Sequence, residues 1–219
     1  MIIAIDGPAG AGKSTIAKRV AKKLGFLYID TGAMYRALTL KVLEQKLDIQ
    51  DASAITALAK DTSIELVNDH ETGLKVFLDR VDVSRSIRQP VVTKFVSDIA
   101  KIKGVREVML RLQRKMGQAV DVVLDGRDIG TVVFPEADKK FYLDADFSER
   151  VNRRYIELKG LGEDVTPAGI EADLMNRDTI DSNREFAPLK KADDAVLVDT
   201  SDMAIDEVVA EVLGRIKNE

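Results

Sequence analysis

The sequence predicts an α/β fold with a doubly wound, mostly parallel sheet. Its first evidence is a set of five short runs that are apolar on successive residues, as in parallel strands covered on both faces. These runs are Ile2–Asp6, Phe26–Ile29, Val120–Leu124, Lys139–Leu143 and Ala195–Val198. Between them lie amphipathic stretches at Ser14–Leu24, Gly32–Glu44, Val91–Lys101, Val105–Gln118 and Ser148–Lys159. Strands and helices that alternate in this way are typical of a sheet with helices on both sides.

One region, from Ser63 to Ile87, departs from that alternation. Three short segments there, at 63–67, 73–78 and 81–83, alternate polar and apolar residues and are separated by polar turns. This pattern predicts a small antiparallel meander inserted into the core. We expect the insertion to hold a substrate or close over it, although a purely structural insertion would have the same pattern. His70, in one of the polar turns, is interpreted as a hairpin-turn residue.

Length and composition favour one ordinary globular domain. The chain has 219 residues, and no repeat or Pro/Gly-rich linker divides it. Its 33 basic and 37 acidic residues give a net charge of −4, which argues against a nucleic-acid partner. The absence of cysteine excludes disulfides, thiolate metal sites and a cysteine nucleophile, and a single histidine makes a histidine metal cluster untenable.

The amino-terminal residues Met1–Asp6 lack the basic region and cleavage site of a signal peptide. No apolar run approaches the roughly 20 residues that span a bilayer. We therefore expect a cytoplasmic protein without a membrane partner.

A phosphate-binding loop stands between the first predicted strand and the first predicted helix. Residues 7–14, Gly-Pro-Ala-Gly-Ala-Gly-Lys-Ser, match G-x-x-x-x-G-K-[ST] without a gap. Glycines let the backbone N–H groups wrap a phosphate, and the helix N-terminus adds a favourable dipole. Lys13 is expected to reach the β- and γ-phosphates, and the Ser14 hydroxyl to ligate Mg²⁺. The motif predicts a nucleoside triphosphate site and leaves the acceptor open.

Two segments next to predicted strands are candidates for an acceptor site. Asp30–Arg36 follows the second strand, where Arg36 would lie near an anion at the helix terminus; helix capping by Asp30 and Thr31 is the simpler alternative. The segment 123–130 follows a buried strand at the sheet edge where ligands bind in open α/β folds. Arg127 and Asp128 are therefore well placed, although an ordinary turn would look the same.

Two arginine clusters lie late in the chain. Arg177, Asp181 and Arg184 are spaced i, i+4 and i+7, so we expect them to share one helical face, and the cluster of Arg150, Arg153 and Arg154 lies upstream. A solvated helix face is the usual explanation for such spacing. Beside a phosphate-binding loop, however, the clusters indicate arginines that converge on the charge that develops during phosphoryl transfer.

The chain resembles the bacterial cytidylate kinases, within the nucleoside monophosphate kinases, nearly from end to end. The resemblance is carried by IDGPAGAGKST at 5–15, DTGAMYRA at 30–37, DVSRSIR at 82–88, VSDIA at 96–100, VRE at 105–107, DGRDIGTVVFP at 125–135, RDTIDSNRE at 177–185 and PLKKADDAVLVDT at 188–200. The phosphate-binding loop is generic, whereas DGRDIGTVVFP and the insertion that ends in DVSRSIR are specific to this family.

The resemblance implies a three-layer P-loop NTPase fold with a five-stranded parallel sheet, a small antiparallel CMP-binding insertion and a short lid. The single kinase domain would comprise a core (about 1–62, 88–149 and 165–219), the insertion (about 63–87 with its flanking helices) and the lid (about 150–164). A monomer is expected. Two departures stand out: Ile180 replaces a basic residue found in some members, and Thr31 replaces a serine.

By similarity, the residues of the P-loop and its helix start would bind ATP: Gly7, Pro8, Ala9, Gly10, Ala11, Gly12, Lys13, Ser14 and Thr15. Cytosine would be read by Ser97, Arg106 and Asp128. Arg36, Arg127 and Arg184 would hold the CMP phosphate, Arg177 and Asp181 the sugar, and Thr31 and Tyr35 would complete that site. Lys13, Arg127, Arg150, Arg154 and Arg184 would act in catalysis, with Arg153 also approaching ATP.

The implied reaction moves the γ-phosphoryl group of ATP, with Mg²⁺, to CMP or dCMP in pyrimidine nucleotide metabolism. A carboxylate and an arginine complement the N4 donor and the N3 and O2 acceptors of cytosine, so CMP and dCMP should be preferred over UMP. Two alternatives remain open: another acceptor, such as UMP, AMP or shikimate, and an NTP-driven switch or motor. The chain has no N-K-x-D or L-S-G-G-Q motif, which weighs against the second.

Overall fold

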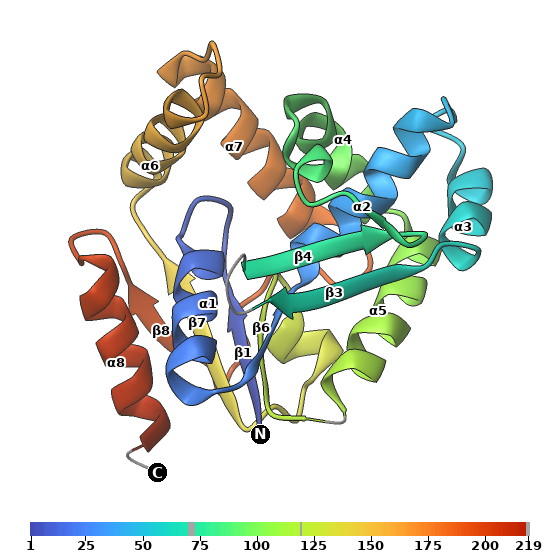
Figure 1. Ribbon diagram of the computed structural model, residues 1–219. Helices are drawn as coiled ribbons and strands as arrows, with labels where there is room; N and C mark the ends of the chain where they lie inside the picture. Colours follow the sequence, from blue (N-terminus) through green and yellow to red (C-terminus); the bar gives the residue numbers. More distant parts are fainter. Residues whose placement is uncertain (70–72, 119, 218–219) are drawn as a thin grey trace.

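The computed structural model describes residues 1–69, 73–118 and 120–217, so the interpretation of His70 lies outside the described residues. Its centre is a five-stranded parallel sheet of order β2-β6-β1-β7-β8 (Figure 1). The strands are β1 (Ile2–Asp6), β2 (Leu27–Asp30), β6 (Val122–Asp125), β7 (Lys139–Asp144) and β8 (Val196–Asp199). The predicted parallel sheet is confirmed.

Helices cover both faces of this sheet, because successive strand residues point to opposite sides. Ile3 and Ile5 of β1 pack against α1 (Lys13–Leu24) and α8 (Ile205–Lys217). Ala4, between them, joins a second cluster with residues of α5 (Lys103–Gly117) and of the π-helical turn η2 (Ile129–Val133). In Figure 1, α1 and α8 lie toward the left of the large sheet and α5 toward the right.

The remaining helices are α2 (Thr31–Glu44), α3 (Ala52–Lys60), α4 (Pro90–Ala100), α6 (Phe147–Gly160), α7 (Pro167–Asn183) and the short 3₁₀ turn η1 (Ser86–Arg88). The five predicted helices are confirmed with small shifts at their ends, whereas α3 and α8 were not predicted. Asp30 caps α2, since its side chain accepts a hydrogen bond from the N–H of Ala33 over 2.8 Å. The capping interpretation of Asp30 is therefore confirmed.

The predicted meander is also confirmed as an antiparallel sheet of order β3-β4-β5. Its strands are β3 (Ile64–Asp69), β4 (Gly73–Leu78) and β5 (Val81–Asp82). Its buried residues share one apolar cluster with α2, α3, α4 and α5, which anchors the small sheet beside the large one. The Asn68 amide also donates to the Tyr28 carbonyl of β2 over 2.9 Å.

Helices α6 and α7 form a hairpin beside the P-loop, at the upper left of Figure 1. Thr166 caps α7 by accepting from the Gly169 N–H, and Pro167 occupies its first turn. Ala9 of the P-loop is buried in a small apolar cluster with Ile170 and Leu174 of α7. The hairpin is thus packed directly on the phosphate-binding loop. Among the described residues, no helix is both long and apolar enough to cross a membrane.

Candidate active site

The P-loop lies between β1 and α1, where the backbone must turn sharply. Gly7 has a φ of +146°, and a Cβ at this position would stand 1.9 Å from the Leu143 carbonyl oxygen, so no larger residue fits there. Gly12, also at positive φ, precedes α1 without a side-chain cap, which leaves the first N–H groups of the helix available to an anion. The loop therefore fits a polyphosphate.

Lys13 is held inside this loop. Its Nζ donates to the Pro8 carbonyl over 2.5 Å, and the side chain is buried. Burial and the neighbouring Arg127 lower the pKa of Lys13, while Asp125 raises it. The positive charge of the Lys13 ammonium is thus only partly balanced by neighbouring acidic groups, and the phosphates of a nucleotide would supply the missing negative charge.

Asp125 ends β6 next to the P-loop and is a site residue that sequence reasoning missed. Its Oδ1 accepts a hydrogen bond from the Tyr28 hydroxyl over 2.8 Å. The pKa of Asp125 is raised to about 7, because burial and the neighbouring Asp30 raise it more than Lys13 and Tyr28 lower it. Ser14, by contrast, is exposed in the first turn of α1. One hydroxyl and one carboxylate beside a phosphate site suit Mg²⁺, which takes few protein ligands and relies on substrate phosphates.

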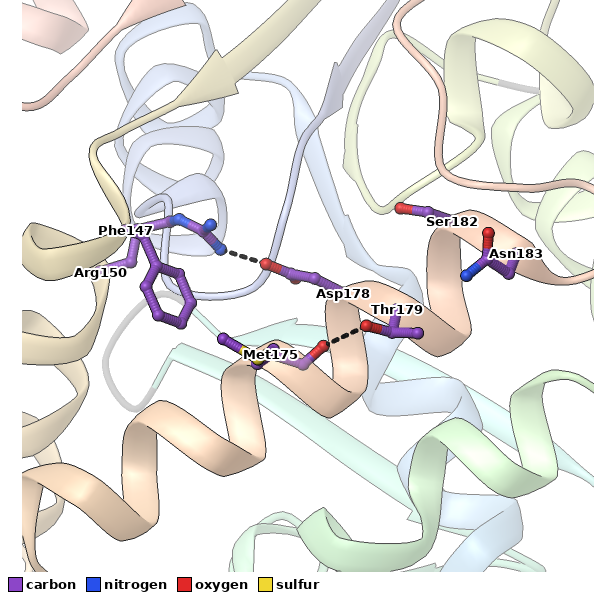
Figure 2. A pocket seen from close by; sticks show the side chains of 7 residues that line it. All are labelled: Phe147, Arg150, Met175, Asp178, Thr179, Ser182 and Asn183. Carbon is purple, nitrogen blue, oxygen red and sulfur yellow. Dashed lines mark hydrogen bonds and ion pairs between the residues drawn. The ribbon is translucent and has the colours of Figure 1, made fainter.

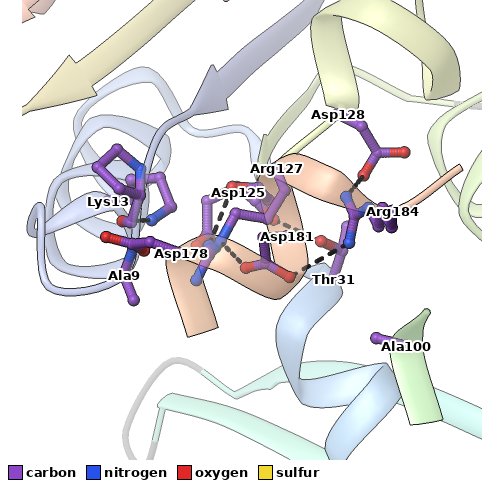
Figure 3. A network of polar contacts seen from close by, with 12 residues as sticks. Ala9, Lys13, Thr31, Ala100, Asp125, Arg127, Asp128, Asp178, Asp181 and Arg184 are labelled. Carbon is purple, nitrogen blue, oxygen red and sulfur yellow. Dashed lines mark hydrogen bonds and ion pairs between the residues drawn. The ribbon is translucent and has the colours of Figure 1, made fainter. Parts of the chain in front are cut away.

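A chain of alternating charges crosses the site (Figure 3). Asp128 accepts from Arg106 (2.5 Å) and lies 3.4 Å from Arg184. Asp181 in turn contacts Arg184 at 3.4 Å and Arg127 at 2.9 Å. The fold therefore joins five predicted acceptor-site residues, from α5, the loop after β6 and the end of α7, into one buried network.

Arg106 has an unusual environment within this network. Its guanidinium lies over the Tyr35 ring, 5.4 Å from the centroid, and donates to the Ala100 carbonyl over 3.3 Å. Its Nε is buried and has no hydrogen-bond partner among the described residues. Ser97 is buried on the neighbouring helix α4. A buried donor without a partner indicates a place for a polar ligand atom.

A second group of buried arginines is only partly compensated by acidic neighbours. The pKa of Arg177 is lowered to about 9 by burial and by the neighbouring cations Arg36 and Arg127, against the opposing effect of Asp181. The pKa of Arg36 is lowered to about 10, mainly by burial; Asp30 opposes the shift, and Arg154 and Arg127 add to it. The Nε of Arg177 also lacks a partner within the described part of the chain. Cations that depress one another's pKa form a site that an anion would stabilise.

Asp6 links the two halves of the site. Its carboxylate accepts hydrogen bonds from the backbone N–H groups of Ile129 (2.8 Å) and Gly130 (2.7 Å), at the start of η2. Asp6 directly precedes the P-loop, and η2 directly follows Asp128. Burial raises the pKa of Asp6 to about 6, although the two backbone donors oppose that shift. Thr31 makes a similar link by donating to the Asp125 carbonyl over 2.7 Å.

The three upstream arginines have different surroundings. Arg150 faces the P-loop and donates to the Ala9 carbonyl over 3.0 Å. Arg154 pairs with Glu157 at 2.8 Å and lies near Arg36 and Arg177. Arg153 instead donates to the Thr200 hydroxyl and carbonyl, so it is not joined to the other two. Figure 2 shows the groove of about 470 Å³ beside Arg150, lined by Phe147, Arg150, Met175, Asp178, Thr179, Ser182 and Asn183.

One prediction needs correction: Arg184 does not share a helical face with Arg177 and Asp181. Helix α7 ends at Asn183, and Arg184 has an extended ψ of 140°. Its side chain turns back because its Nε donates to the Ala187 carbonyl, and it still reaches Asp181. Sequence reasoning also missed Asp6 and Asp178. The position of Asp6 at the carboxyl end of a predicted parallel strand could have indicated it.

Comparison with known proteins agrees with this geometry. The family model described as "Cytidylate kinase" matches residues 3–218. A protein named cytidylate kinase from Desulforamulus reducens is 53% identical over 96% of this chain and 94% of its own length. Another from Clostridioides difficile is 50% identical over 99% and 98%. A solved shikimate kinase from Bacteroides thetaiotaomicron shares the fold, with a TM-score of 0.50 and 12% identity over 99% and 98% of the two chains.

The match to the family model and the P-loop joined to a second, arginine-rich site therefore both indicate a kinase that acts on a nucleotide. The chain belongs to the cytidylate kinase family, a family of nucleoside monophosphate kinases, and is a transferase.

Proposed function

We propose that the protein transfers the γ-phosphoryl group of ATP to CMP or dCMP, giving ADP and CDP or dCDP. The observation that carries this proposal is the buried pair of Arg106 and Asp128 next to buried arginines, such as Arg177, whose positive charge is only partly compensated. A carboxylate and a guanidinium suit cytosine, and the partly compensated cations suit a nucleotide phosphate. An enzyme that only hydrolysed ATP would have no use for this second site.

On the donor side, the P-loop, residues 7–15, would hold the ATP phosphates. The unpaired N–H groups at the start of α1 would meet the phosphate oxygens, and Lys13 would leave the Pro8 carbonyl to bind them. Magnesium, held by Ser14 and Asp125 together with the nucleotide, would neutralise charge on the phosphates. Arg150 and Arg154 would contribute further positive charge.

On the acceptor side, Arg36, Arg127 and Arg184 would hold the CMP phosphate. Arg36 is available for this role, since its one hydrogen bond to a described residue is to the Thr93 hydroxyl. Arg177 and Asp181 would bind the sugar, with Thr31 and Tyr35 bordering the site. Mutual repulsion among these cations favours binding of the anionic substrate.

Base selection would depend on Asp128, Arg106 and Ser97. Each Asp128 oxygen accepts one arginine contact and keeps a second lone pair, so it can also accept from the N4 amino group of cytosine. The unpartnered Nε of Arg106 can donate to a base acceptor. Uracil presents an oxygen where cytosine has its amino group, so the Asp128 lone pair that is left for the base would face an acceptor and stay unsatisfied.

The transfer of the phosphoryl group needs no general base. An oxygen of the CMP phosphate, which is already anionic, forms a bond to the γ-phosphorus of ATP. The bond between that phosphorus and the oxygen that bridges the β- and γ-phosphates breaks as ADP leaves. Lys13 and the arginines would stabilise the charge on the transferring group. Closure of the lid (residues 150–164) and of the insertion (63–87) over the core would exclude water. The division into core, insertion and lid, like the cytoplasmic monomer, stays a prediction.

An acceptor screen tests the proposal. Purified protein is incubated with ATP and Mg²⁺ and with CMP, dCMP, UMP, AMP, shikimate or no acceptor, and ADP formation is measured. We expect ADP to form rapidly only with CMP and dCMP, with equimolar CDP or dCDP. Equal ADP formation without any acceptor would support the NTP-driven switch instead.

A further inference from the structure

Both polar groups of one P-loop residue are held by side chains from the α6–α7 hairpin. The Ala9 N–H donates to Oδ1 of Asp178 over 3.2 Å, and the Ala9 carbonyl accepts from Nη1 of Arg150 over 3.0 Å. The same Nη1 donates to Oδ2 of Asp178 over 2.5 Å, as Figure 2 shows. Three contacts therefore close a triangle between the P-loop, α6 and α7.

The triangle leaves the Arg150 side chain little freedom. Its Nε donates to the Ala145 carbonyl over 3.2 Å, and its guanidinium lies 5.1 Å from the centroid of the Phe147 ring. The site where a Gly10 Cβ would stand is only 3.0 Å from the Arg150 Cβ. The remaining nitrogen, Nη2, makes no hydrogen bond to the residues that the structure describes, so it is the group that Arg150 can offer to a ligand.

Besides these hydrogen bonds, Asp178 has an electrostatic effect on the phosphate-binding loop. A carboxylate that contacts the P-loop backbone stands close to the phosphate site and would repel a bound triphosphate if it were unpaired. The charge-assisted contact with Arg150 neutralises it. Asp178 therefore orients Arg150, and Arg150 in turn neutralises the charge of Asp178.

We propose that Asp178 is a positioning residue, which fixes the Arg150 guanidinium against the P-loop in an orientation ready for ATP. The inference rests on the proposed function, in which Arg150 approaches ATP. Orientation before binding lowers the entropy that ATP binding must remove from a long side chain. The main effect belongs to the donor site, because the triangle lies at the P-loop and shares no hydrogen bond or ion pair with the Arg106–Asp128 network among the described residues; the Asp178 charge acts on Arg127 of that network only through space.

The test compares the Michaelis constants for ATP and for CMP in Asp178→Asn, with Asp173→Asn as control. Asp173 is exposed on the same helix. We expect Asp178→Asn to raise KM for ATP about tenfold, the effect of losing one charged hydrogen bond, with KM for CMP unchanged. Asp173→Asn should change neither. Asp178→Glu, which keeps the charge, should restore part of the ATP affinity. If Asp178→Asn folds poorly, Asp178→Glu is used in its place to test the positioning role.

The double variant separates positioning from a local structural role. Arg150→Ala should raise KM for ATP, and adding Asp178→Asn should lower it again, because the unpaired carboxylate disappears. If Arg150→Ala raises KM for ATP but Asp178→Asn leaves it unchanged, the inference is overturned while the proposed role of Arg150 stands. If Arg150→Ala itself has no effect, the proposed role of Arg150 fails. Equal losses for ATP and CMP in Asp178→Asn would indicate a structural role and overturn the inference.

Discussion

The Arg106 guanidinium and the Asp128 carboxylate form a buried ion pair, with Nη2 and Oδ2 2.5 Å apart and only 4% and 8% of the two side chains exposed. Burying two charges is costly, and a buried pair is weak evidence of a stabilising role. The unpartnered Nε of Arg106 adds to that cost. The pair is therefore better explained by a ligand that it binds than by the stability of the fold.

Replacing Asp128 by asparagine should weaken base selection. An amide presents both a donor and an acceptor, so it can satisfy uracil as well as cytosine. We expect the ratio of kcat/KM for CMP to that for UMP to fall about ten- to hundredfold, from a penalty of roughly 1–3 kcal/mol per unpaired group. Steady-state kinetics with both acceptors measures the ratio. Asp98→Asn, in a half-exposed pair with Lys101, is the control; an unchanged ratio in Asp128→Asn would remove Asp128 from base reading.

Replacing Arg177 by glutamine should stabilise the free protein and weaken acceptor binding. Burial and the neighbours Arg36 and Arg127 disfavour the charge of Arg177, as its lowered pKa reports. We expect the free energy of unfolding to rise by about 1 kcal/mol, and KM for CMP to rise at least about tenfold. Urea unfolding without ligand and kinetics with varied CMP measure the two effects. A loss of stability together with unchanged KM would show that Arg177 has a structural role.

Because of Asp6, the free energy of unfolding should fall as the pH rises, the opposite of the usual effect of an aspartate. Its pKa rises from an ordinary value near 3.8 to about 6 in the folded chain, so the folded state binds the proton more tightly than the unfolded state. Stability is then lost as the pH rises from about 4 to 6 and is constant above that range. Relative to Asp6→Asn, the wild-type protein should lose about 2–3 kcal/mol between pH 4 and pH 7. Urea midpoints of both proteins at several pH values measure this difference, and parallel curves would refute it.

Gly7→Ala should destabilise the fold severely. The new Cβ would stand 1.9 Å from the Leu143 carbonyl oxygen, at a φ of +146° that disfavours any side chain. We expect a loss of at least about 3 kcal/mol, from strain together with the clash. Gly214→Ala is the matched control, because Gly214 lies in α8 and a Cβ added there would meet no described atom within 4 Å. That substitution should stabilise by about 0.5–1 kcal/mol, and thermal unfolding of both variants checks the contrast.

The fold was largely predictable because parallel strands and amphipathic helices leave local signals. The strands β2, β6, β7 and β8 run one residue further than predicted, to Asp30, Asp125, Asp144 and Asp199. An apolar pattern cannot detect a terminal aspartate that still pairs in the sheet. Helix α8 was missed although Val208, Val209, Val212 and Ile216 have helical spacing. Helix α3 has only two buried residues in nine, so its signal was weak.

The site was less predictable, because its contacts join distant segments. Sequence position indicated Asp128 and Arg184, and the resemblance supplied Arg106, but their pairing depends on how α5, β6 and α7 meet. Asp178 lies 169 residues from its contact Ala9, and its sequence position gives no sign of that contact. The bend at Arg184 depends on the carbonyl of Ala187 and breaks the helical spacing on which the prediction relied.

The central claim is that a cytosine nucleotide accepts the phosphoryl group, and the most direct measurement is kcat/KM of the wild-type protein for CMP and for UMP at saturating ATP and Mg²⁺. Uracil would place an acceptor oxygen against the Asp128 lone pair that is left for the base, so CMP should be used at least about tenfold more efficiently than UMP. Equal efficiency with the two nucleotides would contradict the assignment of Arg106 and Asp128 as the base-reading pair.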